Sequence, residues 1–529
     1  MRNKILNQLG IMATVALLLA SCTKDLDRQP KYGNTAASLY VNLAGYKSVL
    51  AKTYAGLTLT GNSGPDGQGD IAGIDEGFSS YIRQYWSAQE LSTDEAVIGW
   101  NDATIKDFHN LAWSSADAFV RALYSRIYFQ ITLCNEFIRE SAAGKLSERG
   151  ISGADATEIG YMNAEARFLR ALSYYHALDL FGNVPFVTEA DNVGAFLPKQ
   201  ISKANLFAYI ETELKAIETQ LKDARTNEYG RADKGAAWAL LSRLYLNAEV
   251  YTGTPKYTDC ITYCNKVTAV AGYSLVSNYR NLFLADNNTT GASEFIFAVN
   301  FDGNKGRTWG GTTFLVHAPI VGSMQAGDHG VDFGWGGIRT TKQFVQKFPN
   351  PVEDRRANFH TTGQNLEISD ISSATDGYGM IKFRNKTSTG ANGSNPTWVD
   401  TDFPFFRLAE IYLNYAEAVL RGGTGGSAAT ALTYINNLRQ RAYGNATGNI
   451  LASQLTVHFM IDERARVLYW EGVRRTDLIR YAQFTEGTYL WAWKGGVAGG
   501  QGVSNNRKLY PIPSADLVAN PNLVQNTGY

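Results

Sequence analysis

The chain has 529 residues, with 49 acidic and 49 basic side chains, so its formal net charge at pH 7 is zero. Hydrophobic residues make up 44% of it, which is enough for a large buried core. A balanced charge provides no extended basic face, so nucleic acid is not an expected partner. After the first 21 residues, no stretch reaches the roughly 18 uncharged apolar residues of a membrane-spanning helix.

The N-terminus has the features of a lipoprotein signal. Arg2 and Lys4 precede a mostly apolar run over 9–20, which suits secretion and is too short to span a bilayer. The residues that follow, "LASC" at 19–22, match the lipobox of bacterial lipoproteins, in which the cysteine is acylated. We interpret residues 1–21 as a lipoprotein signal peptide and Cys22 as the site of acyl (palmitate) attachment, which gives durable anchoring. A plain signal peptide with an incidental cysteine is the alternative.

Three further cysteines, Cys134, Cys260 and Cys264, cannot all pair with one another. Cys260 and Cys264 are four residues apart within a helical pattern, which favours buried apolar thiols over disulfides. Secretion permits disulfides but does not require them.

An internal repeat indicates helical hairpins. The segment "LSRLYLN" at 241–247 resembles "LAEIYLN" at 408–414, and "ITYCNKV" at 261–267 resembles "LTYINNL" at 432–438. A repeated pair of short helices is typical of tetratricopeptide units, which bury their apolar faces by stacking. Gly422 and Gly423 are expected to end the helix that begins near 408.

Other segments fit the same helical scheme. A long stripe over 163–181 ends at Gly182, and 203–221 is its expected partner helix, while 38–57 and 116–141 form an earlier pair. The 130 residues from about 273 to 404 are rich in Gly, Asn, Ser and Thr and contain short strand-like pieces such as "EFIFAVNF". The sequence predicts a mainly α scaffold, with helical pairs over about 38–272 and 405–480 and a loop-rich insertion that carries small β elements. Binding groups are commonly found on such loops.

No strong catalytic or metal-binding motif is present, and the six histidines lack metal-ligand spacing, so no metal or cofactor is expected. The densest charged cluster spans 463–480. Paired carboxylates could serve a glycosidase, but the arginines between them should lower their pKa values. We interpret this cluster as an ion-pair network that fixes a long helix to the scaffold. Trp238 and Trp470, which lie on helical patterns, are expected in the core.

Five ordered segments together resemble the SusD/RagB family of outer-membrane lipoproteins of Bacteroidetes. They are "NAEARFLRALSYYHALDLFGNVPFV", "RADKGAAWALLSRLYLNAEVYTG", "DTDFPFFRLAEIYLNYAEA", "DERARVLYWEGVRRTDLIRY" and "LYPIPSADLVANPNLVQNTGY". The resemblance runs from the lipobox to the last residue, and within the family it is strongest to a starch-binding member. It implies one SusD-like unit over 22–529, a tetratricopeptide-like helical scaffold, and no enzymatic activity.

The resemblance also implies a cellular role. It predicts a lipid-anchored protein of the outer membrane, exposed at the cell surface, that captures an α-glucan and passes it to a SusC-like TonB-dependent barrel. Asp25 and Asp27, close behind Cys22, are similar to the acidic surface-export signal of such lipoproteins.

The starch-binding relative holds its ligand with an arc of aromatic rings, an arginine and an asparagine. By this resemblance the glycan-binding residues are Arg83, Trp100, Asn101, Trp309 and Trp335. Trp309 stands where the relative has a tyrosine, so a ring is kept. Two contacts differ, because Ile98 replaces a second tryptophan, and Ala103 occupies the asparagine position, with Asn101 nearby.

Other functions remain open at this stage. A receptor for another glycan or for peptides would use the same scaffold, a pure interaction scaffold would need no ligand cleft, and a surface glycosidase lacks motif support. Sugar rings stack on flat aromatic faces, whereas peptides need many hydrogen-bonding groups. Three matched aromatic rings favour a sugar.

The lipobox yields a direct test. Replacement of Cys22 by serine should block acylation, because the reaction needs the thiol at this position. We expect the Cys22→Ser protein to stay unprocessed or unlipidated and to no longer sediment with outer membranes, as followed by acyl labelling and fractionation. Acyl labelling and membrane retention equal to those of the wild type would contradict the lipoprotein interpretation.

Overall fold

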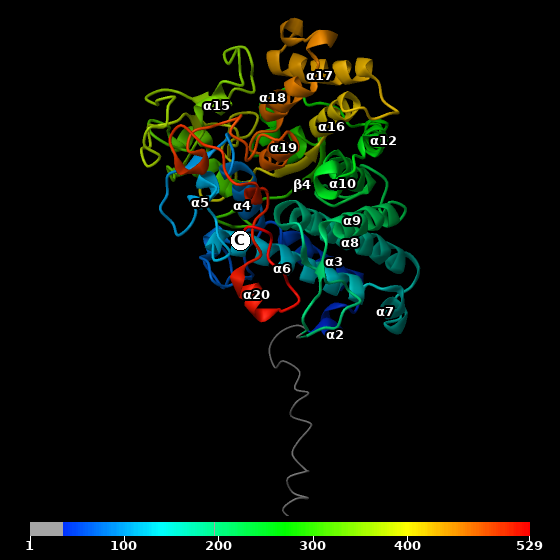
Figure 1. The fold of residues 1–529 in the computed structure, drawn as a ribbon. Helices are drawn as coiled ribbons and strands as arrows, with labels where there is room; N and C mark the ends of the chain where they lie inside the picture. The colour runs from blue at the N-terminus through cyan, green and yellow to red at the C-terminus, as the bar shows by residue number, and fades with distance from the viewer. Residues whose placement is uncertain (1–34, 195) are drawn as a thin grey trace, which may run out of the picture.

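The structure is a computed structural model, and it describes residues 35–194 and 196–529. The predicted signal peptide 1–21 and Cys22 lie outside the described residues. The fold is mainly helical, with helices stacked on one side and a loop-rich region on the other (Figure 1). Within the described residues, no helix is both long and apolar enough to cross a membrane.

The helices differ widely in length. The α-helices are α2 (Ala36–Leu39), α3 (Leu43–Ala55), α4 (Tyr81–Trp86), α5 (Asp107–Asn110), α6 (Ala118–Glu140), α7 (Ala143–Glu148), α8 (Gly153–Phe181), α9 (Lys203–Ile217), α10 (Lys234–Leu246), α11 (Ala248–Thr252), α12 (Tyr257–Thr268), α13 (Asn287–Thr290), α14 (Gly311–His317), α15 (Lys342–Val345), α16 (Leu408–Leu420), α17 (Ala428–Tyr443), α18 (Val457–Leu468), α19 (Arg474–Arg480) and α20 (Ser514–Ala519). The strands are β1 (Val97–Ile98), β2 (Val184–Pro185), β3 (Gln200–Ile201), β4 (Phe295–Val299), β5 (Ile338–Arg339), β6 (Phe359–His360), β7 (Gly379–Met380) and β8 (Phe403–Arg407).

The repeated sequence pairs form two helical hairpins, as predicted. Helices α10 and α12 pack together, as do α16 and α17, and the two hairpins meet where α12 contacts α16. The repeated tyrosines face each other in both: Tyr245 and Tyr263 have ring centroids 5.6 Å apart, and Tyr412 and Tyr434 stack at 4.0 Å with nearly parallel planes. An apolar face that one helix cannot bury alone is thus covered by the next helix along the stack.

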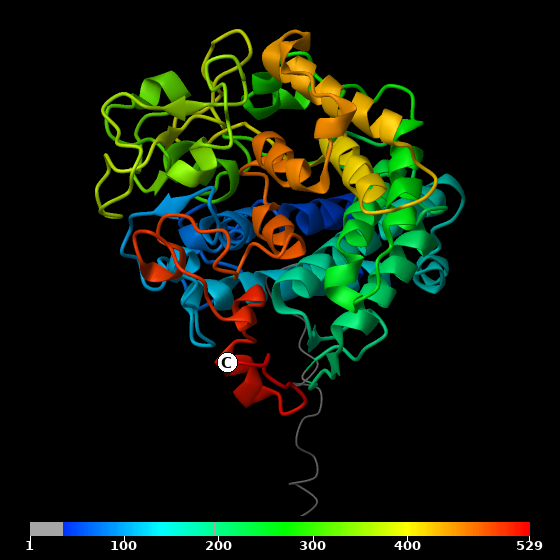
Figure 2. The same cartoon turned by 45° about the horizontal axis from the view of Figure 1, so that its top comes forward.

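The N-terminal half of the stack follows the same rule. Helix α8 packs against α9, as predicted, and ends at Gly182, which adopts a positive φ of 73°. Helix α6 packs mainly on α8, whereas α3 contacts both α6 and α8. The predicted pairing of 38–57 with 116–141 is therefore only part of a larger group built around α8. Figures 1 and 2 show these helices beside one another.

The region between the hairpins contains short elements, as the composition indicated. The predicted strand in "EFIFAVNF" is β4, which pairs antiparallel with β8 at the far end of this region. Three further two-stranded sheets pair β1 with β5, β2 with β3, and β6 with β7. Figure 2 shows the green and yellow-green loops gathered beside the helical stack.

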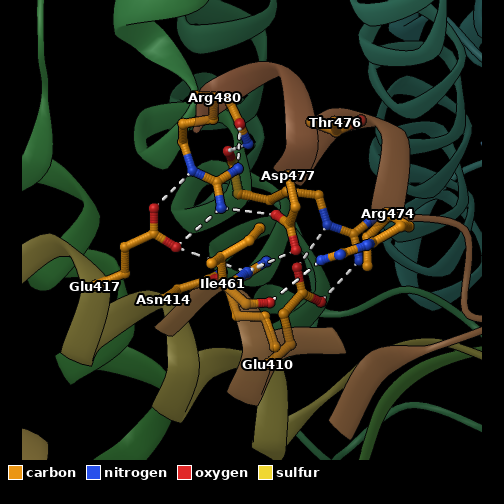
Figure 3. Close-up of polar contacts among 12 residues, drawn as sticks. Glu410, Asn414, Glu417, Ile461, Arg474, Thr476, Asp477 and Arg480 are labelled. Atoms are coloured by element: carbon orange, nitrogen blue, oxygen red, sulfur yellow. Dashed lines mark hydrogen bonds and ion pairs between the residues drawn. The ribbon is translucent and has the colours of Figure 1, made fainter. Parts of the chain in front are cut away.

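The charged cluster is an ion-pair network, as predicted, but it does not lie on one long helix. Helix α18 ends at Leu468, the chain turns at Trp470 with a φ of 62°, and α19 begins at Arg474. Figure 3 shows Arg480 on α19 reaching Glu417 on α16 and Asp477 on its own helix. The network therefore joins two short helices, α18 and α19, to the hairpin stack, whereas the sequence predicted one long helix.

The carboxylates of this cluster are buried and fully engaged. Glu463 accepts hydrogen bonds from Arg356, Arg439 and Arg466, each at 2.7 Å. These neighbours hold the pKa of Glu463 well below its usual range, and arginines likewise lower the pKa of Asp477 to about 2. The predicted direction of these pKa shifts is confirmed, and these groups are unsuited to donate a proton as a glycosidase acid.

Core predictions were right for most, but not all, of the singled-out residues. The three cysteines of the described chain are free and buried, and Trp470 is fully buried, although on a turn instead of a helix. Trp238 is only half-buried on α10, and its Nε1 donates to Glu218 at 2.9 Å. Trp238 packs against the core, so the expectation that it is a core residue is right in part, but the side chain is not fully enclosed.

Replacing Glu463 by glutamine should strongly destabilise the protein. Three buried or nearly buried arginines would lose their shared carboxylate, and breaking a buried pair costs about 3–5 kcal/mol of unfolding free energy. Because the folded-state pKa lies below the unfolded value of 4.5, this contribution is present above that pH and is lost as the pH falls. Urea unfolding measures the difference.

The matched control is Glu148→Gln. Glu148 pairs with Lys145 at 3.0 Å on the surface, with its side chain 66% exposed. Exposed pairs contribute at most about 1 kcal/mol, so this variant should unfold near the wild-type midpoint. Equal midpoints for Glu463→Gln and wild type would mean that the buried network contributes little to stability.

Candidate functional site

The structure brings four of the five predicted glycan-binding residues to one open hollow of about 460 Å³. Its lining comprises Asp66, Asp75, Gly77, Phe78, Arg83, Trp100, Asp102, Trp309, Phe333 and Trp335. Helix α4 carries Arg83, and α5 follows the segment that carries Trp100 and Asp102. Figure 1 shows both helices beside the loop-rich region. The rings therefore come from segments that are far apart in the sequence and meet where the helical stack borders the loops.

A short antiparallel ladder brings two of the tryptophans together. Strand β1 pairs with β5, and just beyond it Gly99 donates its N–H to the carbonyl of Gly337 at 2.9 Å. Trp100 and Trp335 follow and precede this ladder, so their rings lie 6.3 Å apart, and the indole of Trp100 donates to the carbonyl of Trp335. Backbone pairing thus fixes the spacing of these two rings.

Trp335 rests on a histidine. The ring of His317, at the end of α14, stacks on Trp335 with centroids 5.0 Å apart and an angle of 24°. The N–H of Trp335 donates to the carbonyl of His317 at 2.9 Å. The carbonyl oxygens of Phe333 and Thr397 lie 2.7 and 2.9 Å from the two ring nitrogens of His317, and a neutral imidazole, which carries one N–H, donates to one of them. The His317 ring thus supports one face of the half-buried Trp335 ring.

Trp309 provides a third ring on the loop before α14. Its centroid lies 6.1 Å from Trp335 and 5.5 Å from Trp398, at tilted angles. Its indole Nε1 donates to Oδ1 of Asp66 at 2.7 Å. The three rings of Trp100, Trp335 and Trp309 therefore follow one another along the hollow.

Arg83 lies beneath the rings. It belongs to α4, which Ser80 caps by accepting the N–H of Arg83. The guanidinium is within 4.1 Å of the Phe78 ring centroid and 4.4 Å of that of Phe314, and its Nη1 donates to the carbonyls of Gly77 and Trp309. Burial lowers its pKa to about 9, so the group stays charged at neutral pH. Arg83 braces the floor of the hollow.

The fifth predicted residue is not among those that line the hollow. The side chain of Asn101 is exposed, and its Oδ1 accepts a hydrogen bond from Lys106 at 2.6 Å. The neighbouring Asp102 lines the hollow instead. Ala103, at the position where the resemblance expects an asparagine, has a positive φ of 39°.

Sequence reasoning missed Phe333 and the three rim carboxylates. Phe333 is 46% exposed and precedes Trp335 by two residues, in "DFGWGG", where an aromatic pair in a glycine-rich loop was a usable signal. Asp66, Asp75 and Asp102 carried no such signal, because acidic residues in loops are common. Together they make the rim acidic around a single buried guanidinium.

Other features fit a ligand site less well. A larger hollow of about 1150 Å³ lies between the end of α6, α7 and the start of α8, but no aromatic ring lines it. Across residues 35–194 and 196–529, no three His, Cys, Asp or Glu side chains group in a way that could hold a metal ion.

Stacked helical hairpins are typical of a tetratricopeptide-like protein. In this chain, loops beside the stack form the open aromatic hollow. The family comparisons agree with this class. A sequence model of the SusD family matches residues 364–529, and a second, described as starch-binding associating with outer membrane, matches 72–246. Over the whole of both chains, the sequence is 36% identical to the starch-binding protein SusD of Bacteroides thetaiotaomicron. The chain belongs to the SusD family.

Solved structures share its fold. Surface glycan-binding protein A from Bacteroides thetaiotaomicron, in complex with laminarihexaose, superposes with a TM-score of 0.69 at 20% identity, covering 91% of this chain and 99% of that one. A laminarin-binding SusD-like protein gives a TM-score of 0.69 at 22% identity, covering 92% and 100%. At these identities the similarity establishes the fold alone.

We predict that the Trp100 ring can keep its position only if residue 337 has no side chain. A Cβ atom at Gly337 would lie 2.3 Å from Cε2 of Trp100, closer than any real contact allows. The Gly337→Ala substitution should displace the Trp100 ring and weaken oligosaccharide binding several-fold, as measured by isothermal titration.

Gly327→Ala is the control for this prediction. Nothing lies within 4 Å of a Cβ atom built at Gly327, and its backbone conformation is open to other residues. Its affinity should equal that of the wild type. Unchanged binding by Gly337→Ala would mean that Trp100 does not contribute to the ligand surface.

Proposed function

We propose that the protein is a non-catalytic, cell-surface binder of starch and maltooligosaccharides. The observation that carries the proposal is the row of three indole rings, Trp100, Trp335 and Trp309, in one open hollow. The 36% identity to a starch-binding relative over the full length supports the same substrate class.

The chemistry of the hollow suits a neutral sugar chain. The C–H faces of pyranose rings stack on indoles, and a few polar groups then orient the hydroxyls. Successive tilted rings match a ligand that curves, as an α-glucan does. The carboxylates of Asp66, Asp75 and Asp102 on the rim would repel an acidic glycan, whereas they can accept hydrogen bonds from the hydroxyls of a neutral one.

A second candidate is a neutral β-glucan. Two proteins of the same fold are described as bound to laminarihexaose and as laminarin-binding. Both are below 25% identical to this chain, so the more similar starch-binding relative carries more weight. A peptide receptor is less well supported, because five of the ten residues that line the hollow are aromatic.

The cellular setting is part of the proposal. A lipid on Cys22 would anchor the protein in the outer membrane, facing outward, and the captured glycan would pass to a SusC-like TonB-dependent barrel. The "LASC" sequence and the outer-membrane description of the matched family support this placement.

Removing single rings should weaken binding in steps. Stacking one ring on one or two glucose units buries on the order of 60 Å² of apolar surface, worth roughly 1.5 kcal/mol at about 25 cal/mol/Å². Trp335→Ala should therefore raise the dissociation constant for maltoheptaose about tenfold. The triple Trp100, Trp309, Trp335→Ala variant should show no measurable binding in isothermal titration while remaining folded.

Trp238→Ala serves as the control, because Trp238 lies on α10 and does not line the hollow. Its affinity should be unchanged. Wild-type affinity should barely depend on salt, since the ligand is uncharged. Normal maltoheptaose binding by the triple variant would disprove the aromatic site. Wild-type protein that ignores maltoheptaose but binds laminarihexaose would overturn the α-glucan assignment and leave the family assignment intact.

A further inference from the structure

Trp309 is the least supported of the three rings. Trp335 lies on the ring of His317, and Trp100 is enclosed by the backbone at Gly337. The ring neighbours of Trp309 are Trp335 and Trp398, and both meet it at tilted angles of more than 50°. The ring is half-buried on a loop, and no parallel-stacked ring supports its face as His317 supports Trp335.

The backbone of Trp309, in contrast, is firmly held. The Nη1 of Arg83 donates to its carbonyl at 3.3 Å, and the next two glycines approach Ser80, whose hydroxyl accepts the N–H of Gly311. Gly77 lies on another side, where a Cβ atom would come within 3.2 Å of the Trp309 Cβ. The remaining freedom of Trp309 is therefore in its indole, not in its main chain.

Among the residues that the structure describes, one polar contact fixes that indole. Its Nε1 donates to Oδ1 of Asp66 at 2.7 Å, across 243 positions of sequence. A hydrogen bond to a carboxylate is shorter and stronger than one between neutral groups. Both partners are partly exposed, so the benefit is in orientation more than in overall stability.

The loop that carries Asp66 has a rigid base. The N–H of Asp70 donates to the carbonyl of Thr60 at 2.7 Å, and Gly61 bridges to Gly69. Arg126 on α6, whose side chain is fully buried, donates to the carbonyl of Thr60 and pairs with Asp70 at 3.1 Å. The tip of the loop, 62–68, therefore extends from a fixed base toward the hollow.

We propose that Asp66 is a positioning residue for glycan binding, because its carboxylate holds the indole of Trp309 at a fixed angle in the row of rings. The inference rests on the proposed function, and it adds a residue that acts through Trp309. A ring held in place before binding loses less freedom when the sugar stacks on it, which raises affinity.

A double-mutant cycle tests the coupling. Asp66→Ala should weaken maltoheptaose binding three- to tenfold, whereas Asp66→Asn, which keeps an oxygen that accepts the indole hydrogen, should stay within twofold of the wild type. In a Trp309→Phe background, which keeps a ring but has no N–H to donate, Asp66→Ala should weaken binding far less than it does in the wild type, because only a direct contact of Asp66 with the sugar is then lost. Isothermal titration supplies all of these values.

Asp102→Ala is the matched control, since Asp102 also lines the hollow and its loss removes the same charge. Whatever its effect on affinity, that effect should be equal in the wild-type and Trp309→Phe backgrounds. An Asp66→Ala effect that persists undiminished in the Trp309→Phe background would overturn the proposal. So would an Asp66→Asn variant as weak as Asp66→Ala, since the carboxylate would then act by charge.

A ligand-free measurement separates this proposal from the proposed function. In protein labelled with 5-fluorotryptophan, the ¹⁹F resonance of Trp309, identified by its loss in Trp309→Phe, should shift and broaden in Asp66→Ala. It should stay in place in Asp66→Asn and Asp102→Ala. If the wild type binds no α-glucan, the glycan assignment fails while this resonance still reports on the indole. An unmoved resonance in Asp66→Ala overturns the positioning role itself.

Discussion

A buried arginine, Arg407, joins three parts of the chain at one point. Its side chain is 1% exposed, and it stands where β8 ends and α16 begins. It donates to Glu294, next to β4, at 2.9 Å, and to Glu471, between α18 and α19, at 2.6 Å. Removing such charges from water is expensive unless every donor finds an acceptor. The loop-rich region, the second repeated hairpin and the C-terminal helices must therefore come together in one register.

That register determines where the aromatic hollow forms. Strands β4 and β8 pair at the two ends of the loop-rich region, so a long irregular segment leaves the helical stack and returns to it at one place. Within this region β5 pairs with β1, which comes from the N-terminal half, and the rings of Trp100 and Trp335 are brought side by side. The helices form the scaffold, and the loops supply most of the side chains that line the hollow.

The difference between helical scaffold and loops also explains why the carboxylates of these two regions have different surroundings. The carboxylates among α16, α18 and α19 are buried, paired with arginine and kept ionised, so they serve the fold. The carboxylates of Asp66, Asp75 and Asp102 line an open hollow whose one guanidinium, Arg83, is covered by rings. Acidic groups thus form buried ion pairs in the scaffold, whereas at the hollow they line an open surface.

The helical hairpins could be predicted from the sequence, because apolar periodicity is local and each amphipathic face must be covered by a neighbour. So could the family and, through that resemblance, four of the side chains that line the hollow. Four features became visible in the folded chain alone: the break at Trp470, the half-burial of Trp238, the inclusion of Phe333 in the lining and the absence of Asn101 from it. These features lie on turns, helix edges and loops without periodicity. Their positions depend on contacts between distant segments, such as Asp66 with Trp309, which no local pattern in the sequence records.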